Sequence, residues 1–293
     1  MAAIPARLGD RYEWMRLTLS ELSFEAGDWD TARCCLASTE TGQLLIFRRL
    51  REAELALGIG DLDTAAHSLV ELEPVVASSL QPQWIGLLGS LLAELALREG
   101  DLLAARTTVA KTLYRLKDRN EETVRIARVS AVGAWVETEI ARHARDRGDT
   151  AGKRDAINRT RGHVQSLRDY ARAGGPVERA WRTVGTAELT RARGRSDPAE
   201  WLRAAKRWDA IVRPYQGAIA RWRATAALIE LGDLMAAANA AYAGLQTARS
   251  LGSTWLLNEF TTLVERSALD LTTHGPRERA SEERQPSLSR TAR

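Results

Sequence analysis

Apolar residues recur along the chain at intervals of three and four, which is the spacing of one face of an α-helix. Tyr12, Met15, Leu19 and Leu22 follow this spacing and predict one apolar stripe on a helix over about residues 11–27. Similar stripes return in later segments, whereas runs rich in Val, Ile and Thr are absent. Aromatic residues make up only 6% of the chain, and Ala, Leu, Arg and Glu dominate. Together these features predict an all-α protein.

A short joint between helices interrupts this pattern again and again. Gly60 follows a helical segment and can adopt the left-handed conformation that ends a helix. Asp61 can then cap the next helix, because its carboxylate accepts from free backbone N–H groups and suits the positive end of the helix dipole. A degenerate copy of the joint, with Pro in the first helical turn, occupies residues 194–198. The main joints are formed by Gly27, Asp28, Gly60, Asp61, Gly100, Asp101, Gly148, Asp149, Gly232 and Asp233.

The spacing of the joints predicts the architecture. Successive joints stand 33 to 48 residues apart, a distance typical of helix-pair repeats. One pair cannot bury its apolar face alone, so neighbouring pairs must stack. We therefore predict a right-handed α-solenoid of about six antiparallel helix pairs, with a capping helix over residues 254–271. The strongest break, at residues 173–176, would divide N-terminal repeats (1–173) from C-terminal repeats (174–271), and the polar residues 272–293 predict a disordered tail.

The joint resembles the Gly-Asp-x-x-x-Ala core of the tetratricopeptide repeat in four places, those that begin at Gly27, Gly60, Gly100 and Gly232. The resemblance extends to small residues seven positions before several joints, at Ser20, Ala53, Ala93 and Ala141. The Trp and Tyr of that repeat's first helix are missing, and Lys153 stands where the fourth joint should have Ala. The resemblance therefore implies a divergent tetratricopeptide-like array.

In the last third, five segments follow one another in a characteristic order, at residues 213–215, 220–223, 230–233, 248–252 and 265–271. In this order they resemble large bacterial transcription regulators of the LuxR/MalT type. That family carries an N-terminal nucleotide-binding ATPase domain, a helical-repeat sensor region and a C-terminal helix-turn-helix. This sequence contains no Gly-x-x-x-x-Gly-Lys-Ser/Thr phosphate loop and no helix-turn-helix after residue 271, so we expect neither ATP binding nor direct DNA binding by this chain. It looks like the middle of such a regulator, either truncated or standing alone.

Charge and targeting signals narrow the function classes. The net charge is +4, but residues 1–100 carry −7 and residues 101–293 carry +11, which fits a bipolar rod better than a nucleic-acid binder. The only cysteines, Cys34 and Cys35, are neighbours on a predicted helix and point apart, so no disulfide framework is expected. The N-terminus lacks a signal peptide, and no apolar run is long enough to span a membrane. We expect a cytoplasmic protein.

No pattern of residues in the sequence predicts a catalytic site or a metal site. Asp28 with Asp30, and Asp61 with Asp63, form carboxylate pairs that could bind a metal, but their place after Gly favours helix caps. No Ser/His/Asp or Cys/His set can be assembled from the sequence. We therefore predict no enzyme activity, no cofactor and no metal. The four histidines are scattered without paired spacing, at His67, His143, His163 and His274.

Two groups of residues are candidates for binding. The first helices of the pairs line the concave surface of such a solenoid, and a partly exposed Trp there can anchor a ligand or peptide. Residues 142–182 hold 11 Arg or Lys against 5 Asp or Glu, which favours either a solvated face or a site for an acidic partner or a phosphate-bearing effector. The basic cluster comprises Arg142, Arg145, Arg154, Arg159, Arg161 and Arg168. The candidates for groove and partner binding are Trp84, Arg125, Arg128, Trp135, Arg142, Arg145, Trp181, Arg182, Arg221 and Trp222.

These observations favour one functional hypothesis and leave two alternatives open. The leading hypothesis is a non-catalytic module of a LuxR-type regulator that binds a protein or small effector in its concave groove. The second is a free-standing adaptor that joins two proteins, one through the acidic residues 1–100 and the other through the basic residues 101–293. The third, an all-helical enzyme, is the least favoured. The sequence does not determine the oligomeric state.

Overall fold

The fold is an all-α solenoid. The computed structural model describes residues 6–37, 43–117 and 123–271, so the tail predicted over 272–293 lies outside the described residues. The described ranges contain thirteen helices and no strand. In chain order these are α1 (Ala6–Ala26), α2 (Trp29–Leu36), α3 (Gln43–Ile59), α4 (Leu62–Ala77), α5 (Pro82–Glu99), α6 (Leu102–Leu116), α7 (Thr123–Asp146), α8 (Thr150–Ala173), α9 (Pro176–Ala192), α10 (Pro198–Asp209), α11 (Pro214–Leu231), α12 (Leu234–Leu251) and α13 (Thr254–Arg266).

The Gly-Asp joints form as the sequence predicts. The glycines of the five main joints have φ values between +70° and +111°, the left-handed region that Gly adopts without a Cβ penalty. Each following Asp accepts a hydrogen bond from the backbone N–H three residues on, as Asp61 Oδ1 does from Thr64 at 3.0 Å. The degenerate copy behaves similarly, because Asp197 caps α10. The cap prediction is therefore confirmed at every joint.

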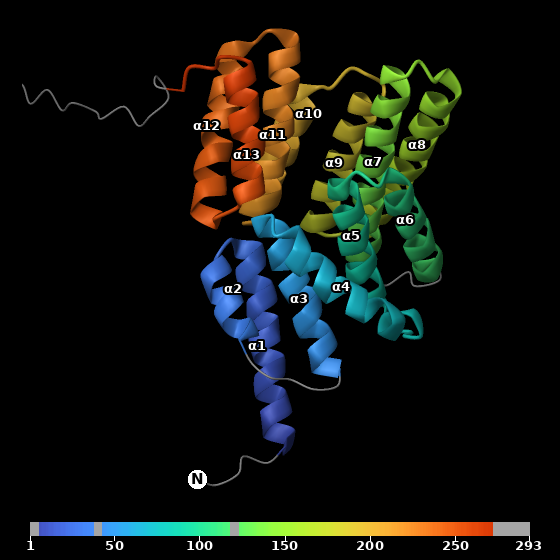
Figure 1. Ribbon diagram of the computed structural model, residues 1–293, viewed down its shortest axis with the longest axis vertical. Helices are drawn as coiled ribbons and strands as arrows, with labels where there is room; N and C mark the ends of the chain where they lie inside the picture. Colours follow the sequence, from blue (N-terminus) through green and yellow to red (C-terminus); the bar gives the residue numbers. More distant parts are fainter. Residues whose placement is uncertain (1–5, 38–42, 118–122, 272–293) are drawn as a thin grey trace, which may run out of the picture.

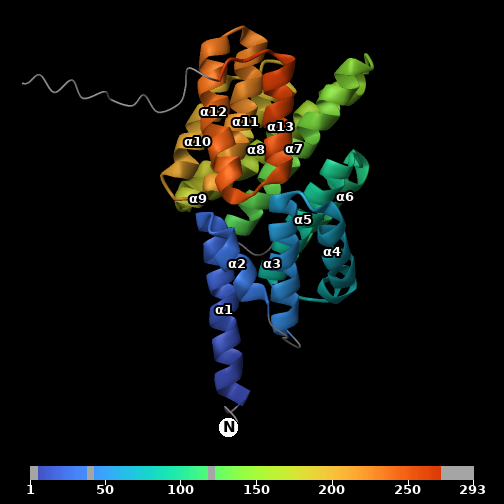
Figure 2. The ribbon, with the colours of Figure 1, turned by 60° about the vertical axis from the view of Figure 1, so that its left-hand side comes forward.

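The helices form six antiparallel pairs, from α1 with α2 to α11 with α12, followed by α13. In Figures 1 and 2, α1 to α4 make the lower part, and α11 to α13 stand above them. Helices α5 to α10 connect these two parts along the chain, and in Figure 1 α5 to α9 lie on the right-hand side. The predicted domain break at residues 173–176 falls between α8 and α9, and α9 packs on both α7 and α8 across it. The division into two domains stays a prediction.

The solenoid closes on itself after one turn. The first repeats, α1 to α3, contact the last helices, α11 to α13, and we call this contact the seam. Ser253 Oγ and Thr254 Oγ1, at the start of α13, donate to the carbonyl oxygens of Gly58 and Ile59, both at 2.7 Å. The last carbonyls of a helix have no partner inside it, so α13 supplies partners to the end of α3 from 195 residues away.

Aromatic rings fill the seam around Tyr215. The ring of Tyr215 in α11 lies 6.0 Å from that of Phe24 and 5.4 Å from that of Trp29, centroid to centroid, both edge-on. Arg98 of α5 donates to the Tyr215 hydroxyl at 2.9 Å, and its guanidinium lies 3.9 Å above the Trp255 ring. Edge-on rings and cations over rings are favourable geometries, so the seam is a packed interface between the two ends of the turn.

The apolar stripe of α1 faces solvent instead of the core. Tyr12, Met15, Leu19 and Leu22 are 62%, 70%, 48% and 54% exposed. The buried face of α1 carries Leu17, Phe24 and small serines instead, because Ser20 lets α2 approach closely and donates to the Ala32 carbonyl at 3.1 Å. As the first described helix of the stack, α1 is covered by neighbours on one side only. Within the described ranges, no helix is long and apolar enough to cross a membrane.

Candidate functional site

A cavity lies in the middle of the closed turn. Its volume is about 60 Å³, which is room for a few waters or part of a small ligand. Side chains from the first helix of all six pairs line it, so both ends of the chain contribute to one site. The main lining residues are Phe24 (α1), Glu54 and Leu57 (α3), Leu91 and Glu94 (α5), Arg128, Val132 and Trp135 (α7), Trp181, Val184 and Glu188 (α9), Trp201 and Trp208 (α10), and Tyr215, Gln216, Ile219 and Arg223 (α11).

Four tryptophans make much of the cavity wall. Trp201 and Trp208 of α10 are 1% and 2% exposed, and Trp135 and Trp181 come from α7 and α9. The rings of Trp181 and Trp208 meet edge-on with centroids 4.7 Å apart. A wall of packed aromatic rings is rigid and apolar, which suits the body of an apolar ligand.

One buried charge network borders the cavity at α3. Glu54 is 5% exposed and accepts from Arg51 and Arg128, each at 2.5 Å. Arg51 also pairs with Glu21 of α1 at 2.7 Å. Burial raises the pKa of the Glu54 carboxyl, but Arg128 and Arg51 outweigh it, so the pKa is lowered overall. Glu54 therefore stays ionised and ties α1, α3 and α7 together.

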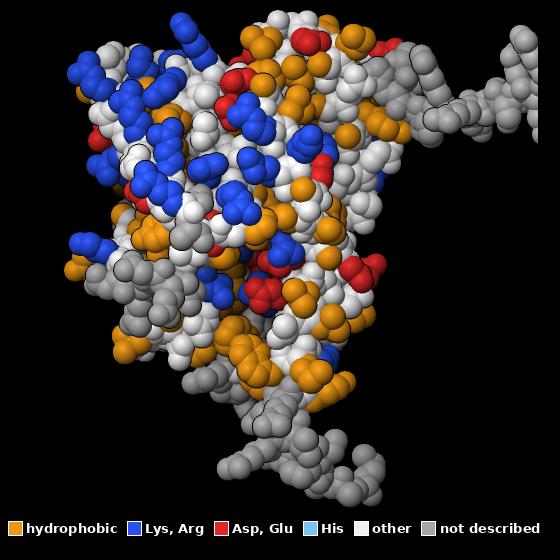
Figure 3. Space-filling view, turned by 180° about the vertical axis from the view of Figure 1, so that it is seen from behind, with side chains coloured by type: hydrophobic (Ala, Val, Ile, Leu, Met, Phe, Trp, Pro, Cys, Tyr) orange, Lys and Arg blue, Asp and Glu red, His pale blue; other side chains and the backbone are white. Residues whose placement is uncertain are grey.

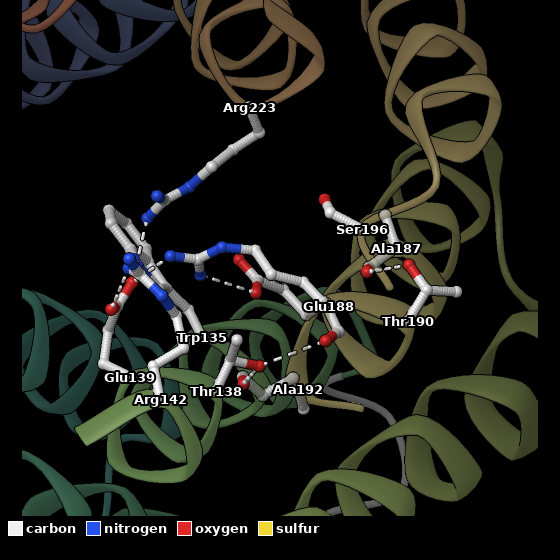
Figure 4. A network of polar contacts seen from close by, with 12 residues as sticks. Trp135, Thr138, Glu139, Arg142, Ala187, Glu188, Thr190, Ala192, Ser196 and Arg223 are labelled. Carbon is white, nitrogen blue, oxygen red and sulfur yellow. Dashed lines mark hydrogen bonds and ion pairs between the residues drawn. The ribbon is translucent and has the colours of Figure 1, made fainter. Parts of the chain in front are cut away.

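A second network, shown in Figure 4, joins α7, α9 and α11. Glu139 accepts from Arg191 at 2.6 Å, from Arg142 at 2.9 Å and from Arg223 at 3.2 Å. Arg191 also pairs with Glu188 at 3.2 Å. Three guanidinium groups thus share two carboxylates, which leaves one positive charge in excess.

The pKa values of this network follow from burial and from that imbalance. Burial raises the pKa of the Glu139 carboxyl, but Arg191 and Arg223 outweigh it and lower the pKa to about 2. Burial, and then repulsion from Arg191, lower the pKa of the Arg223 guanidinium to about 10. At neutral pH both Glu139 and Arg223 therefore remain charged.

Two polar atoms at the cavity have no partner among the described residues. These are Nε1 of Trp208 and Oε1 of Gln216, both buried. A buried donor or acceptor without a hydrogen bond is costly and is rare in folded proteins. Each of these atoms therefore needs a hydrogen-bond partner in the cavity, either a water molecule or a ligand group.

A charged mouth adjoins the cavity. A second hollow, of about 70 Å³, shares Arg128, Trp181, Trp208 and Gln216 with it. Its remaining walls carry charges of both signs, from Glu21, Glu25, Arg51, Arg125 and Arg213. On the rear face of the molecule, a hollow with acidic and basic side chains lies between the lower and upper parts (Figure 3). The mouth and the cavity thus share part of their walls, and charged side chains gather on the mouth.

The outer surface carries a separate basic face. Lys and Arg side chains gather over the upper left of Figure 3. A groove of about 490 Å³ between α8 and α9 is lined by Arg161, Arg168 and Arg193 over an apolar floor of Val164 and Leu189. No acidic residue lines this groove, and none of its three arginines forms an ion pair with a described residue.

The structure separates the predicted binding residues into three groups. Arg128, Trp135 and Trp181 line the cavity, and Arg125 lines its mouth. The Arg142 side chain is about half exposed and holds Glu139 from outside the cavity. The others lie elsewhere: Trp84 packs in the core on Phe47, Arg145 donates to the Ala192 carbonyl, Arg221 pairs with Asp209, Trp222 packs on Trp255, and Arg182 lies half-buried on α9 outside the cavity lining.

Several cavity residues were not predicted from the sequence. They include Glu54, Glu188, Gln216 and Arg223, which are charged or polar and so resemble surface residues in a sequence. A signal existed on α11, where residues 216, 219, 220 and 223 follow the helical spacing of one face and all line the cavity. The basic cluster also divides, because Arg159 pairs with Asp155 while Arg154, Arg161 and Arg168 are exposed.

Comparisons with known proteins leave the function open. No protein-family model matches the chain, and no curated protein matches it. Among solved structures, the chain is similar to a Rap protein complexed with Competence and Sporulation Factor, at 13% identity and a TM-score of 0.34. That similarity covers 88% of each chain. A likeness this low says nothing about what the present chain binds. Among the described residues, no group of three or more His, Cys, Asp or Glu lies close enough together to hold a metal.

Proposed function

We propose that this chain is a non-catalytic sensor module that binds a small effector in its central cavity. The observation that carries the proposal is the wall itself: rigid tryptophans, buried charges and unpartnered polar atoms converge from all six helix pairs. Ligand sites are typically concave and mostly apolar with a few placed polar groups. A small effector suits this interior better than a peptide, because the seam closes the turn around a narrow space.

Binding at this site would be linked to closure of the turn. The lining includes Phe24 from α1 and Tyr215 from α11, which also meet each other at the seam. A ligand that contacts both ends stabilises the closed form over an open one by its difference in affinity for the two. Closure of the seam is therefore the conformational response that a partner domain would sense.

The experiment compares two Val→Phe variants. Val184 of α9 lines the cavity and is only half-buried, so V184F puts a ring into the cavity space. Val75 of α4 is 49% exposed and lies outside the cavity, so V75F is the matched control. Thermal unfolding is recorded for the wild type and both variants against a library of small amphipathic molecules. The proposal expects compounds that raise the Tm of wild type and V75F but not of V184F. Compounds that stabilise all three equally, or none that stabilise the wild type, would contradict it.

The context that we propose is a bacterial transcription regulator of the LuxR/MalT type, acting in the cytoplasm. Support comes from the resemblance of residues 200–271 to the sensor region of that family. The test is the DNA on either side of the reading frame. A helix-turn-helix encoded downstream, or a phosphate loop upstream, agrees with this context. Flanking DNA that encodes neither would contradict it.

A second candidate function, an adaptor, has one specific observation in its favour. The groove between α8 and α9 presents Arg161, Arg168 and Arg193, and no acidic residue lines it, which suits an acidic protein segment. Binding of a fluorescent oligo-glutamate peptide, compared between wild type and R161E/R168E, tests this function. Binding that falls steeply in the variant and in high salt agrees with an adaptor, and wild-type affinity in the variant argues against one.

A further inference from the structure

We infer that the cavity selects an anionic effector, namely a small apolar or aromatic carboxylate whose negative group pairs with Arg223. The inference rests on the proposed function and adds the chemistry of the ligand. It depends on three observations: the incomplete pairing of Arg223, the two unpartnered polar atoms, and their spacing along α11.

Arg223 is a buried cation whose pairing is incomplete. Its residue is 8% exposed, and it lines the cavity. The guanidinium makes one hydrogen bond to a described residue, from Nη2 to Glu139 Oε1 at 3.2 Å. A guanidinium has five N–H donors, so four of them have no protein acceptor in the described chain. The rings of Trp222 and Trp135 lie 3.8 Å and 5.2 Å from its Cζ and stabilise the charge without satisfying those donors.

The carboxylates near Arg223 are already in use. Glu139 also accepts from Arg191 and Arg142, and Glu188 pairs with Arg191. The other two carboxylates in the cavity wall are paired as well, Glu54 with Arg128 and Glu94 with Arg98. A buried charge is costly unless it is both paired and hydrogen-bonded. A ligand carboxylate in the cavity would neutralise the excess positive charge and accept two of the free N–H groups in the bidentate geometry that guanidinium favours.

The opposite end of the site offers hydrogen-bonding groups beside the charge pairs of the mouth, where Arg51 and Arg128 already hold Glu54. Gln216 precedes Arg223 by seven residues, or two helical turns, so the two side chains lie on one face of α11 about 10 Å apart along the helix axis. Trp208 and Gln216 both line the cavity and its mouth, and their Nε1 and Oε1 atoms are unpartnered among the described residues. A hydroxyl can accept from an indole N–H and can donate to an amide oxygen, so a hydroxyl suits either atom.

The middle of the site is apolar. Ile219 and Ala220 lie between Gln216 and Arg223 on the same face of α11, and Trp135 and Trp181 stand on other walls. The site thus orders its ligand groups as carboxylate, apolar body and hydroxyl. Inorganic anions lack the apolar body, and neutral amphipathic molecules lack the partner for Arg223.

The test uses 4-hydroxybenzoate as the probe and its uncharged amide, 4-hydroxybenzamide, as the matched ligand. Isothermal titration calorimetry measures both on the full chain, in wild type, R223Q and R161Q. Arg161 is exposed and lines the groove between α8 and α9, outside the cavity, so R161Q is the control for a general loss of positive charge. We expect the carboxylate to bind at least about tenfold more tightly than the amide in wild type and R161Q, and this preference to vanish in R223Q.

Each other outcome has a defined meaning. Equal affinity for the two probes, a preference that survives in R223Q, or no binding of either probe would overturn the inference. Where the amide binds wild type but not V184F, the cavity still binds effectors and only its selectivity for anions fails. Where neither probe binds and no library compound distinguishes V184F from V75F, both proposals fail. If R223Q does not fold, W208F serves instead. It removes the indole N–H donor together with part of a buried ring, so it should weaken both probes while keeping the carboxylate preference, and a preference lost in W208F would overturn the inference.

Discussion

Gly60 and Gly100 occupy the same position in two successive joints, yet their surroundings differ. Both have a positive φ, +111° and +85°, and both precede an Asp that caps the next helix. A Cβ on Gly60 would lie 2.9 Å from the Trp255 Cβ and 3.1 Å from the Trp255 backbone nitrogen. A Cβ on Gly100 would meet no described atom within 4 Å. One local motif therefore serves two purposes, a turn everywhere and a close contact at the seam.

The other joints fall into the same two classes. Gly27 belongs with Gly60, because a Cβ there would lie 2.6 Å from Pro214 Cγ. Gly148 and Gly232 belong with Gly100, since a Cβ on either would meet no described atom within 4 Å. This difference shows that the repeat pattern in the sequence is enough to form the turns. Closure of the solenoid depends in addition on which of these turns pack against α11 to α13.

Gly→Ala substitutions at the joints should cause the largest change in the free energy of unfolding. A left-handed Ala costs about 1 kcal/mol or somewhat more at any joint, so we expect about that loss for G100A and G232A. At the seam the added methyl also clashes with a packed neighbour, which typically costs a further 1–3 kcal/mol or so. G27A and G60A should therefore lose about 2–4 kcal/mol in urea unfolding. Equal losses at all four positions would remove the distinction between the two classes.

The second prediction concerns the seam at high pH. Burial raises the pKa of the Tyr215 phenol to about 12, although Arg98 acts in the opposite direction. The folded state therefore favours neutral Tyr215, and its contribution is fully present below pH 10 and lost as the pH rises from about 10 to about 12. A shift of this size corresponds to about 2–3 kcal/mol. Y215F should lose less stability than wild type over that window, and identical alkaline profiles would place Tyr215 outside a buried seam.

A smaller effect is expected from Ser253, which is fully buried and donates to the Gly58 carbonyl at 2.7 Å. S253A leaves that carbonyl without its long-range donor and should cost about 1–2 kcal/mol. Ser250 is exposed and donates only to a carbonyl three residues before it, so S250A is the control and should be near neutral. Equal unfolding free energies for S253A and wild type would show that the hydrogen bond across the seam does not form in solution.

Removing an Asp cap should cause the smallest loss of unfolding free energy, and the loss should be the same in both classes of joint. The Asp caps are local, as Asp61 accepts from Thr64 and Asp101 accepts from Ala104. D61A and D101A should each cost about 1 kcal/mol in urea unfolding. A much larger loss of unfolding free energy for D61A than for D101A would mean that the Asp61 carboxylate also stabilises the seam. The caps would then not be equivalent in the two classes of joint.

The sequence predicted the parts of this fold that are local. Helix ends at Gly27, Gly60, Gly100, Gly148 and Gly232 follow from backbone conformation and capping, and both depend on residues close in sequence. The seam could not be predicted in this way, because Ser253 meets Gly58 only after the nine helices α4 to α12 have accumulated their small rotations. The exposed stripe of α1 has a similar origin, since spacing identifies an apolar face but not whether a neighbour covers it.

The candidate site was predicted only in part for a related reason. Trp135 and Trp181 were recognised as residues of the inner helices, and they line the cavity. Arg223 and Glu54 were missed because a charged residue is buried only when its partner is at hand, and those partners come from other helices. Trp84 was expected in the groove, but Phe47 and the surrounding core cover it.

Closure of the turn is the central claim, and a cross-link across the seam tests it most directly. A Cβ on Gly27 would lie 3.8 Å from the Cβ of Pro214, the mean separation in disulfides of about 3.8 Å. The measurement is disulfide formation in G27C/P214C, with Cys34 and Cys35 replaced and with G100C/P214C as the control. A closed turn predicts that G27C/P214C oxidises nearly completely while the control keeps free thiols. Free thiols in both, in protein that is helical by circular dichroism, would contradict closure and with it the enclosed cavity.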